Sequence, residues 1–583
     1  MDIEELLNYK PMRSLEDVEK EEGTSGEQQQ QQQRAAKRLK IASISNASLN
    51  ANEDSDEVAF AANAPLDEMA LKRLLLQFER KVLKNQELRI KFADTPTKFM
   101  DSEMELFDCI QKMNVISTQP ELYKVLVELN IIQTVLGLLS HENTDISCAV
   151  VAFLHELCDL DNCDEMDDVS IILDALIDGQ LIPQLVSNLE RLDETVKEES
   201  EGVYNTLAII ENLTDYKPEL TKDCQGFFPW ILQRLKSKLP FDANKLYSSE
   251  ILAILLHNCD ENRKLLGTLN GIDTLLQQLA YYKRHDPSTT DEHEYMENLF
   301  DCLCSSLLCC YENRDLFYKG EGIELMNLII KEKRKKGSTT NVRMGALKVI
   351  NHVLSTDKGK DDLLEACCNK FVDILGLRVL FPVFMTPKSV IGNCKRKEAR
   401  DAIENVEEHC LSIILALLKY CKLENKKRVV GKFIETDFEK TERLMELHFK
   451  YAEKLMKCDS LIKKEKALKE ANDEEIDEDE LFMRRLTIGG LFTLQLIDHI
   501  ILYICSLYDE HFGSTSSSSS SKSSQSNQSN PSAKNESIKA RIMKLINIHV
   551  TSINHYKFIK NIMKDMAEEQ EDKEKILQLI EEF

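Results

Sequence analysis

Residues 179–215 read GQLIPQLVSNLERLDETVKEESEGVYNTLAIIENLTD, and this stretch contains the unit that decides the fold. A short apolar helix opens at Gly179, a polar connection follows, and a second apolar helix ends in NLTD. In both helices the apolar residues recur at three- and four-residue spacing, which is typical of amphipathic α-helices. One such pair cannot bury its apolar stripe alone. The stretch therefore predicts a repeated unit that stacks on similar neighbours.

Similar helix openings recur every 45 to 54 residues along the chain, at Asn130, Gly179, Gly226, Gly271, Gly322 and Gly376. A second apolar helix lies between successive openings, as in AVVAFLHELCD at 149–159 and SEILAILLHNCDENR at 249–263. The period slightly exceeds the ~40–47 residues of armadillo and HEAT units, and polar inserts account for the excess. We expect the opening glycine to end one helix in the left-handed conformation, so that the next helix starts at a sharp angle.

The repeats predict an all-α fold, an armadillo/HEAT-type right-handed superhelical solenoid with a helical N-terminal cap and a helical C-terminal region. We expect a mostly disordered tail at 1–64, the cap at 65–125, the repeats at 126–435 and the C-terminal region at 436–583. The tail contains six consecutive glutamines, and a Ser-rich insert at 513–532 interrupts the last region. Such segments cannot bury enough apolar surface to offset their ordering entropy, so both are predicted to be disordered.

The chain is strongly acidic, with 100 Asp and Glu against 74 Lys and Arg and a net charge of −26 over 583 residues. A protein that grips phosphate backbones needs positive charge, so we expect no direct contact with nucleic acid. The charge favours basic partners instead. The apolar segment 488–508 carries Asp498 and His499 near its centre, which are costly in hydrocarbon. It therefore predicts a buried helix, and we expect no membrane association.

Catalytic and metal-binding patterns are absent from the sequence. It has no phosphate-binding glycine loop, no dinucleotide fingerprint and no zinc-protease or nucleophile-elbow motif. His141-Glu142 and His293-Glu294 lack a second histidine at metal-binding spacing. The 17 cysteines lie mostly in apolar helical patterns and are expected to be reduced, buried hydrophobes. We therefore expect neither an enzyme, nor a cofactor, nor a metal site.

A binding groove is expected where the last helix of each unit lines the concave face of the array. When the units are aligned by their DEN and TD endings, polar residues recur at the exposed positions of these helices. Carboxylates there would hold a Lys- and Arg-rich segment through charge-assisted contacts. The candidate groove residues are Glu156, Asp159, Asn205, Asn212, Asp215, Asp260, Asn298 and Asp301. The chain has one tryptophan, Trp230, which excludes the repeated Trp/Asn ladder of nuclear import adaptors.

A short basic cluster lies in the N-terminal tail, in the sequence RAAKRLK at 34–40. Its charged residues are Arg34, Lys37, Arg38 and Lys40, which form a candidate nuclear localisation signal. The cluster predicts a nuclear protein and an importin as one partner.

Longer stretches point to a particular family. They run in order along the chain and include MDIEELLNY (1–9), VYNTLAIIENL (203–213), PFDANKLYSSEILAILL (240–256), KGEGIELMNL (319–328) and RRLTIGGLF (484–492). In these stretches the chain resembles the beta-catenin-like family of armadillo-type nuclear proteins associated with the spliceosome. The resemblance implies membership of a NineTeen-type complex that supports spliceosome activation. It also implies binding of basic, localisation-signal-like segments of splicing partners.

The leading hypothesis is therefore a non-enzymatic nuclear scaffold in pre-mRNA splicing. Two alternatives stay open, a cargo adaptor for nuclear import and a signalling scaffold of the catenin type. A weak homodimer also stays open, because nothing in the sequence decides the oligomeric state.

Overall fold

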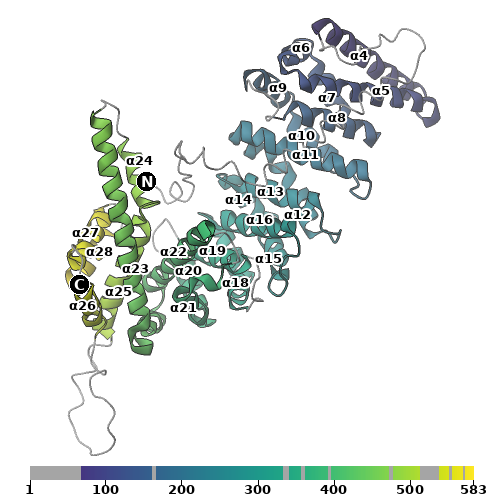
Figure 1. Cartoon of the computed structure of the whole chain (residues 1–583). Coiled ribbons are helices and arrows are strands. Elements are labelled where there is room, and N and C mark those ends of the chain that lie inside the picture. The colour runs from purple at the N-terminus through teal and green to yellow at the C-terminus, as the bar shows by residue number, and fades with distance from the viewer. Residues whose placement is uncertain are drawn as a thin grey trace, which may run out of the picture. The chain divides into compact units, whose positions relative to one another are not determined.

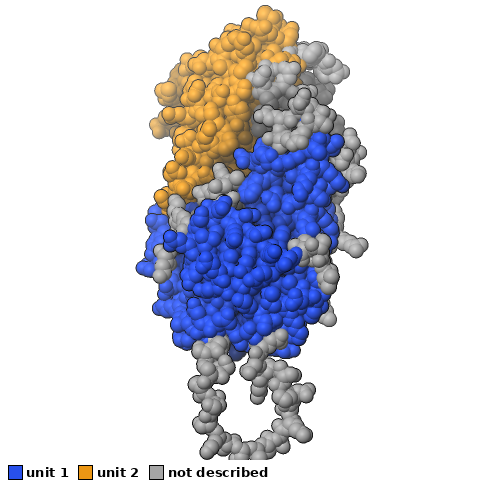
Figure 2. Space-filling view, turned by 90° about the vertical axis from the view of Figure 1, so that its left-hand side faces the viewer, with its two compact units in different colours: residues 1–9, 266–583 blue, residues 10–265 orange. Residues whose placement is uncertain are grey.

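The computed structural model describes residues 67–159, 166–332, 341–355, 362–391, 396–471, 477–511, 537–549, 554–568 and 572–583. The predicted tail at 1–64 with its basic cluster, and the Ser-rich insert at 513–532, lie outside these residues. Every regular element within the described residues is a helix, which confirms the all-α prediction. The chain forms two compact units, an amino-terminal unit of residues 10–265 and a carboxy-terminal unit of residues 1–9 and 266–583 (Figure 2).

The amino-terminal unit consists of α-helices joined by short turns and 3₁₀ segments (Figure 1). Its longer α-helices are α4 (Glu68–Lys91), α5 (Met100–Met113), α8 (Thr144–Leu157), α9 (Met166–Asp178), α11 (Lys197–Tyr216) and α13 (Ala243–Leu256). Shorter α-helices are α6 (Tyr123–Glu128), α7 (Ile131–Gly137), α10 (Leu181–Leu189), α12 (Phe227–Lys236) and α14 (Asp260–Thr268), of which α14 crosses the division between the units. The 3₁₀ segments are η1 (Pro96–Lys98), η2 (Asn114–Thr118), η3 (Pro120–Leu122), η4 (Leu138–Ser140) and η6 (Pro218–Gly226).

One layer of this unit is a row of neighbouring helices in which α5 packs on α8, α8 on α11 and α11 on α13. The segments that connect these helices pack on one another or on the row: α6 packs on α9, α10 on η4 and α12 on α13. The interior is apolar; Leu154, Leu207 and Ile251 are fully buried, one on each of α8, α11 and α13. Burial of about 1.5–3 kcal/mol per such side chain makes the stacked face the main source of stability.

All six predicted openings are followed by a helix, and α15, for example, begins at Gly271. The expectation that the glycines adopt the left-handed conformation is wrong. The positive φ angles belong to neighbouring residues, at Gln180, Asn270, Glu321 and Leu375, whereas Asn130 itself is left-handed as expected. The glycines serve close packing instead. A Cβ at Gly271, Gly322 or Gly376 would lie 2.3–2.5 Å from the nearest atom of the residue five positions earlier, which is Leu266, Phe317 or Phe371.

The carboxy-terminal unit continues the same helical pairing. Its first α-helices are α15 (Gly271–Tyr281), α16 (Thr290–Leu307), α17 (Tyr311–Lys319), α18 (Gly322–Lys331), α19 (Val342–Leu354), α20 (Asp362–Asp373), α21 (Leu377–Met385) and α22 (Arg396–Tyr420), with η7 at Pro387–Ser389. The last are α23 (Leu423–Ala471), α24 (Glu478–Leu486), α25 (Leu491–His511), α26 (Ile538–Ile548), α27 (His555–Glu568) and α28 (Lys573–Glu582). Non-helical residues 435–438 interrupt α23 next to the domain boundary predicted at 435.

Helix α25 is the one described helix that is long and apolar enough to cross a membrane, by length and composition alone; two bent helix pairs in the amino-terminal unit would bring that number to three. The sequence predicted a buried helix here. In the structure α25 packs on α22, α23, α27 and α28, and its polar residues Asp498 and His499 are buried. Asp498 Oδ1 lies 2.6 Å from Nδ1 of His448 on α23, so the polar centre of α25 meets a polar partner inside the protein.

The cysteines follow the prediction. The described cysteines are all free and all buried except Cys309 and Cys458. Burial raises the pKa of the Cys158 thiol to about 12, and the nearby Asp159 carboxylate adds to the shift. Such thiols stay protonated and behave as small apolar side chains.

Candidate functional site

An open groove runs across the row of helices in the amino-terminal unit and encloses a volume of about 1390 Å³. It is lined by α5, α8 and α11, with Tyr247 of α13 at one end, and we call it the acidic groove. The helices run in the same direction, because their amino-terminal turns contact one another. Thr144 of α8 donates to Glu199 of α11 at 2.9 Å, and Asn143 before α8 donates to Glu103 of α5 at 3.0 Å.

Small side chains form the floor of the acidic groove. Cys148, Ala149 and Ala152 of α8 face Gly202 and Ala208 of α11. Ala152 follows Cys148 and Ala149 by four and three residues, and Ala208 follows Gly202 by six, so on each helix the small residues lie on the face toward the groove. A Cβ at Gly202 would lie 2.7 Å from Cys148 Sγ, so the two helices approach as closely as this glycine allows.

Carboxylates dominate the charge of the acidic groove. No lysine or arginine is among the described residues that line it. The nine acidic residues that do are Glu103, Asp108, Asp145, Glu156, Asp159, Glu198, Glu201, Glu211 and Asp215. Five of these make no ion pair or hydrogen bond through their side chains to any described residue, and all five are exposed: Asp108, Asp145, Glu198, Glu201 and Asp215. The groove therefore presents negative charge that the described part of the protein does not neutralise.

Glu211 and Glu103 each have a structural partner. Glu211 accepts a hydrogen bond from the Tyr247 hydroxyl, and the ring of Tyr247 lies 5.0 Å from that of Tyr204. Glu103 forms an ion pair with Arg89 of α4 at the opposite end of the groove. These contacts involve only Glu103 and Glu211 and leave the five exposed carboxylates named above unpaired within the described residues.

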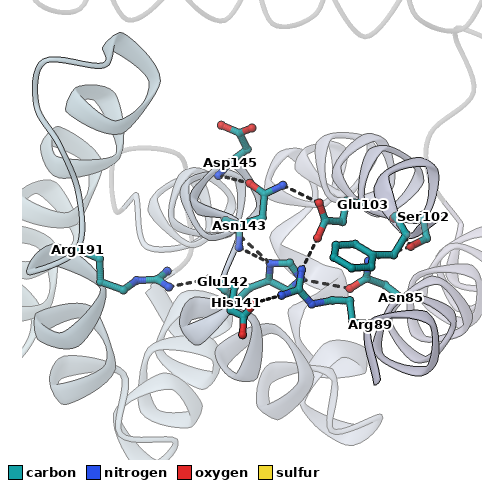
Figure 3. Close-up of polar contacts among 10 residues, drawn as sticks. Asn85, Arg89, Ser102, Glu103, His141, Glu142, Asn143, Asp145 and Arg191 are labelled. Carbon is teal, nitrogen blue, oxygen red and sulfur yellow. Dashed lines mark hydrogen bonds and ion pairs between the residues drawn. The ribbon is translucent and has the colours of Figure 1, made fainter. Parts of the chain in front are cut away.

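Figure 3 shows the polar cluster that closes the α5 end. The Arg89 guanidinium contacts both Glu103 and Glu142. Beside it, His141 Nε2 lies 3.2 Å from the Asn85 side-chain oxygen, and Arg191 donates to the His141 carbonyl oxygen at 2.7 Å. The cluster joins α4, α5, the turn before α8 and the end of α10. Arg89 is thereby committed to holding the helices together rather than to neutralising the groove.

The position of the acids along their helices is unusual. Asp215 lies in the last turn of α11, Glu156 in the last turn of α8, and Asp159 just beyond that helix. A helix C-terminus carries partial negative charge, so a carboxylate there costs about 0.3–1 kcal/mol of stability. Both the carboxylates and the terminal carbonyls attract a cation at this rim. The arrangement disfavours folding slightly and favours a basic ligand.

Two amides project into the groove from α11. Asn205 is only 9% exposed, and its side chain makes no hydrogen bond to any described residue. Asn212 lies two turns further along the same helix face and is also without such a bond. Asn212 is half-buried, and neither side chain has a fully buried, unpaired polar atom, so both amides remain accessible from the groove. Both are therefore free to pair with the backbone of a bound segment.

The field of the acids also acts on a neighbouring thiol. The pKa of Cys148 is raised to about 12, first by burial and then by Glu199 and Asp145. The thiol is thus neutral and unreactive at the groove floor. Within the described residues no group of three or more His, Cys, Asp or Glu could hold a metal ion. The carboxylates and amides that line the groove can bind a ligand through charge and hydrogen bonds.

The structure brings together five of the eight residues predicted for the groove: Glu156, Asp159, Asn205, Asn212 and Asp215. The other three lie elsewhere. Asp260 begins α14 and pairs with Arg263 at 3.0 Å, because the chain turns at Asn258 (φ 52°) after α13 ends. Asn298 and Asp301 lie on α16 in the carboxy-terminal unit, where Lys348 donates to Asp301 at 2.7 Å.

Sequence reasoning missed the amino-terminal halves of the groove helices. Asp145, Glu198 and Glu201 lie on the same faces as the predicted residues, about three helical turns before Glu156 and four or more before Asp215. Counting backwards from Glu156 and Asp215 in steps of three and four residues would have found them. The α5 wall was missed because it falls in the segment assigned to a cap.

Known proteins give a consistent picture. A family model described as "Catenin-beta-like, Arm-motif containing nuclear" matches residues 46–542. The chain is 45% identical over 538 residues to "Beta-catenin-like protein 1" of Homo sapiens, covering 89% of this chain and 87% of that protein. The Mus musculus protein of the same name matches equally well. The "Beta-catenin-like protein 1 homolog" of Schizosaccharomyces pombe is 33% identical over 448 residues, covering 76% of this chain and 74% of that protein.

Proposed function

The chain belongs to the catenin-beta-like family of Arm-motif containing nuclear proteins, and from this premise we propose that it is a non-enzymatic nuclear scaffold in pre-mRNA splicing. In this proposal the acidic groove binds basic, localisation-signal-like segments of splicing proteins. The family resemblance supports the link to splicing. The groove supports the chemistry of the partner.

The observation that carries the binding proposal is the charge of the acidic groove. Nine carboxylates and no lysine or arginine line it. Unpaired carboxylates such as Glu201 and Asp215 would meet Lys and Arg side chains, and the amides of Asn205 and Asn212 would pair with the segment backbone. Long-range attraction between an acidic groove and a basic segment speeds association and weakens with salt.

Affinity purification from nuclear extract tests the proposal. The bait is the full chain, and the comparison bait carries Glu198→Gln, Glu201→Gln and Asp215→Asn. We expect splicing proteins with the wild-type bait and a marked loss with the triple variant, because three unpaired groove charges are removed. Glu87→Gln on the outer face of α4 is the matched control, since Glu87 is exposed and lies outside the groove. No enrichment of splicing proteins over an empty matrix would refute the splicing role.

The basic cluster in the N-terminal tail adds a proposal for how the chain enters the nucleus. We propose that Arg34, Lys37, Arg38 and Lys40 bind an importin, because a short cationic cluster is the chemistry such receptors recognise. Lys37→Ala with Arg38→Ala should move a fluorescently tagged chain toward the cytoplasm. An unchanged nuclear distribution would contradict this part of the proposal and leave the groove untouched.

The alternative of an import cargo adaptor is weaker, because Trp230 lies in α12 and does not line the acidic groove. A catenin-type signalling scaffold would associate with membrane-bound partners, and cell fractionation separates it from a splicing scaffold.

A further inference from the structure

The α5 wall of the acidic groove differs chemically from the other two walls. Met100, Met104 and Phe107 follow one another at four- and three-residue spacing and all line the groove. Met100 is 53% exposed and Met104 is 62% exposed, although both are large apolar side chains. On α8 and α11 the amino-terminal groove positions hold Asp145, Glu198 and Glu201 instead. The α5 wall thus adds an apolar strip to its carboxylates Glu103 and Asp108, whereas the amino-terminal parts of the other two walls are acidic.

We propose that the acidic groove selects basic segments that also carry an apolar side chain, which packs on Met100, Met104 and Phe107. This inference rests on the proposed function of the groove and specifies the ligand more closely. The occupant is a protein segment with Lys or Arg residues toward α8 and α11 and an aliphatic or aromatic residue toward α5. A segment with charge alone would leave the α5 wall in water.

Because the walls differ, a bound segment would make an apolar contact with α5 and charged contacts with α8 and α11. Methionine is flexible and polarizable, and it is over-used at surfaces that accommodate varied apolar partners. Its exposure on a groove wall leaves apolar area that a ligand would bury at roughly 25 cal/mol per Å². The neighbouring Asp108 is exposed and unpaired among the described residues, so a cation beside the apolar residue would also be met.

The Asn205 amide gives an independent reason to place a peptide in this groove. It is nine-tenths buried, points into the groove and makes no hydrogen bond within the described chain. A peptide backbone offers the donor and acceptor that such an amide lacks. A lipid surface fits poorly, because the groove is concave and acidic, and a nucleic acid would be repelled by the nine carboxylates.

The experiment compares two fluorescent peptides binding to the full chain. Both are rich in Lys and Arg; one carries a single Leu beside the basic run, and the other has Ser in its place. Affinities are measured by anisotropy at low salt and at about 1 M salt, where the Debye length falls to about 3 Å. We expect the Leu peptide to bind about fivefold more tightly, which equals about 1 kcal/mol of apolar burial. The preference should persist at high salt while both affinities fall.

The double variant Met100→Gln with Met104→Gln should abolish the preference and bind both peptides equally. The matched control is Leu76→Gln with Leu83→Gln on α4, whose side chains are 53% and 59% exposed and lie outside the groove. Circular dichroism confirms that each variant folds. Equal binding of the two peptides by the wild-type chain, or a preference that survives in the double methionine variant, would overturn the inference. Failure of both peptides to bind at low salt would overturn the proposed function itself.

Discussion

Asp215 and Glu198 place the same charge in the acidic groove from opposite ends of α11. Substitutions at these two residues should therefore have the same effect on binding but opposite effects on stability. Glu198 lies in the first turn and Asp215 in the last. A negative charge is favourable at a helix N-terminus and unfavourable at a C-terminus, by about 0.3–1 kcal/mol in each case. Asp215→Asn should therefore stabilise the unit, and Glu198→Gln should destabilise it. The two variants should differ by about 1 kcal/mol in unfolding free energy.

Both substitutions should weaken the binding of a basic peptide, because each removes one unpaired groove charge. Exposed ion pairs are worth about 0.2–1 kcal/mol, so the affinity of each variant should fall by about 1.4- to fivefold at low salt. The difference from wild type should shrink as salt rises, since exposed charges are screened. Asp215→Asn is thus predicted to make the protein more stable and its binding weaker.

The assay uses the single tryptophan of the chain. Trp230 lies in α12 of the amino-terminal unit, so its fluorescence follows urea unfolding of the unit that contains the groove. Anisotropy of a labelled Lys- and Arg-rich peptide gives the affinity of the same samples, and Glu87→Gln serves as the control. Wild-type affinity in both groove variants at low salt would refute the electrostatic reasoning. A stability change of the same sign in both would refute the helix-end argument.

Three further predictions concern packing and burial. Gly202→Ala should lower the unfolding free energy by about 1–3 kcal/mol in the Trp230 assay, because the added Cβ would meet Cys148 Sγ. Adding Cys148→Ala should recover part of this loss. Arg234→Met should cost about 3–5 kcal/mol in the same assay, because it removes the ion-pair partner of the buried Glu194 carboxylate; the double variant with Glu194→Gln should be more stable than Arg234→Met. Burial, assisted by the charge of Lys419, lowers the pKa of His499 to about 3. The unfolded chain therefore takes up this proton below about pH 6.5 while the folded chain does not, so stability is lost as the pH falls. Between pH 7 and pH 5 the wild-type chain should lose about 2 kcal/mol from this group, and His499→Phe should not, as measured by urea unfolding followed by circular dichroism.

The helical repeats could be predicted from the sequence because each unit repeats a local pattern. Asn130, Gly271 and the other openings precede helices that the structure contains, and the apolar spacing of α8 and α11 is enough to define their buried faces. The role of the glycines could not be predicted. A tight turn is visible in the sequence, but whether glycine supplies a left-handed angle or the absence of a Cβ depends on the packing of Gly271 against Leu266.

The candidate site could be predicted only where the sequence repeat keeps its register. Asp215 lies in the last turn of α11, but Asp260 follows a turn at Asn258 and begins the next helix, so similar sequence endings occupy different places. The sequence also does not show which carboxylates are neutralised by a lysine from another repeat. Lys348 lies 47 positions after Asp301 in the chain, and it neutralises a carboxylate that was predicted to belong to the groove. The apolar wall of α5 could be recognised only once its neighbours were known.

The central claim is that the acidic groove holds basic segments of splicing proteins, and site-specific cross-linking tests it most directly. A photoreactive amino acid replaces Asn205 at the groove floor, the full chain is irradiated in nuclear extract, and the attached peptides are identified by mass spectrometry. We expect Lys- and Arg-rich peptides of splicing proteins, which should be absent when the same photoreactive residue replaces Glu87 on α4. Attached peptides that are not basic, or that come equally from both positions, would contradict it.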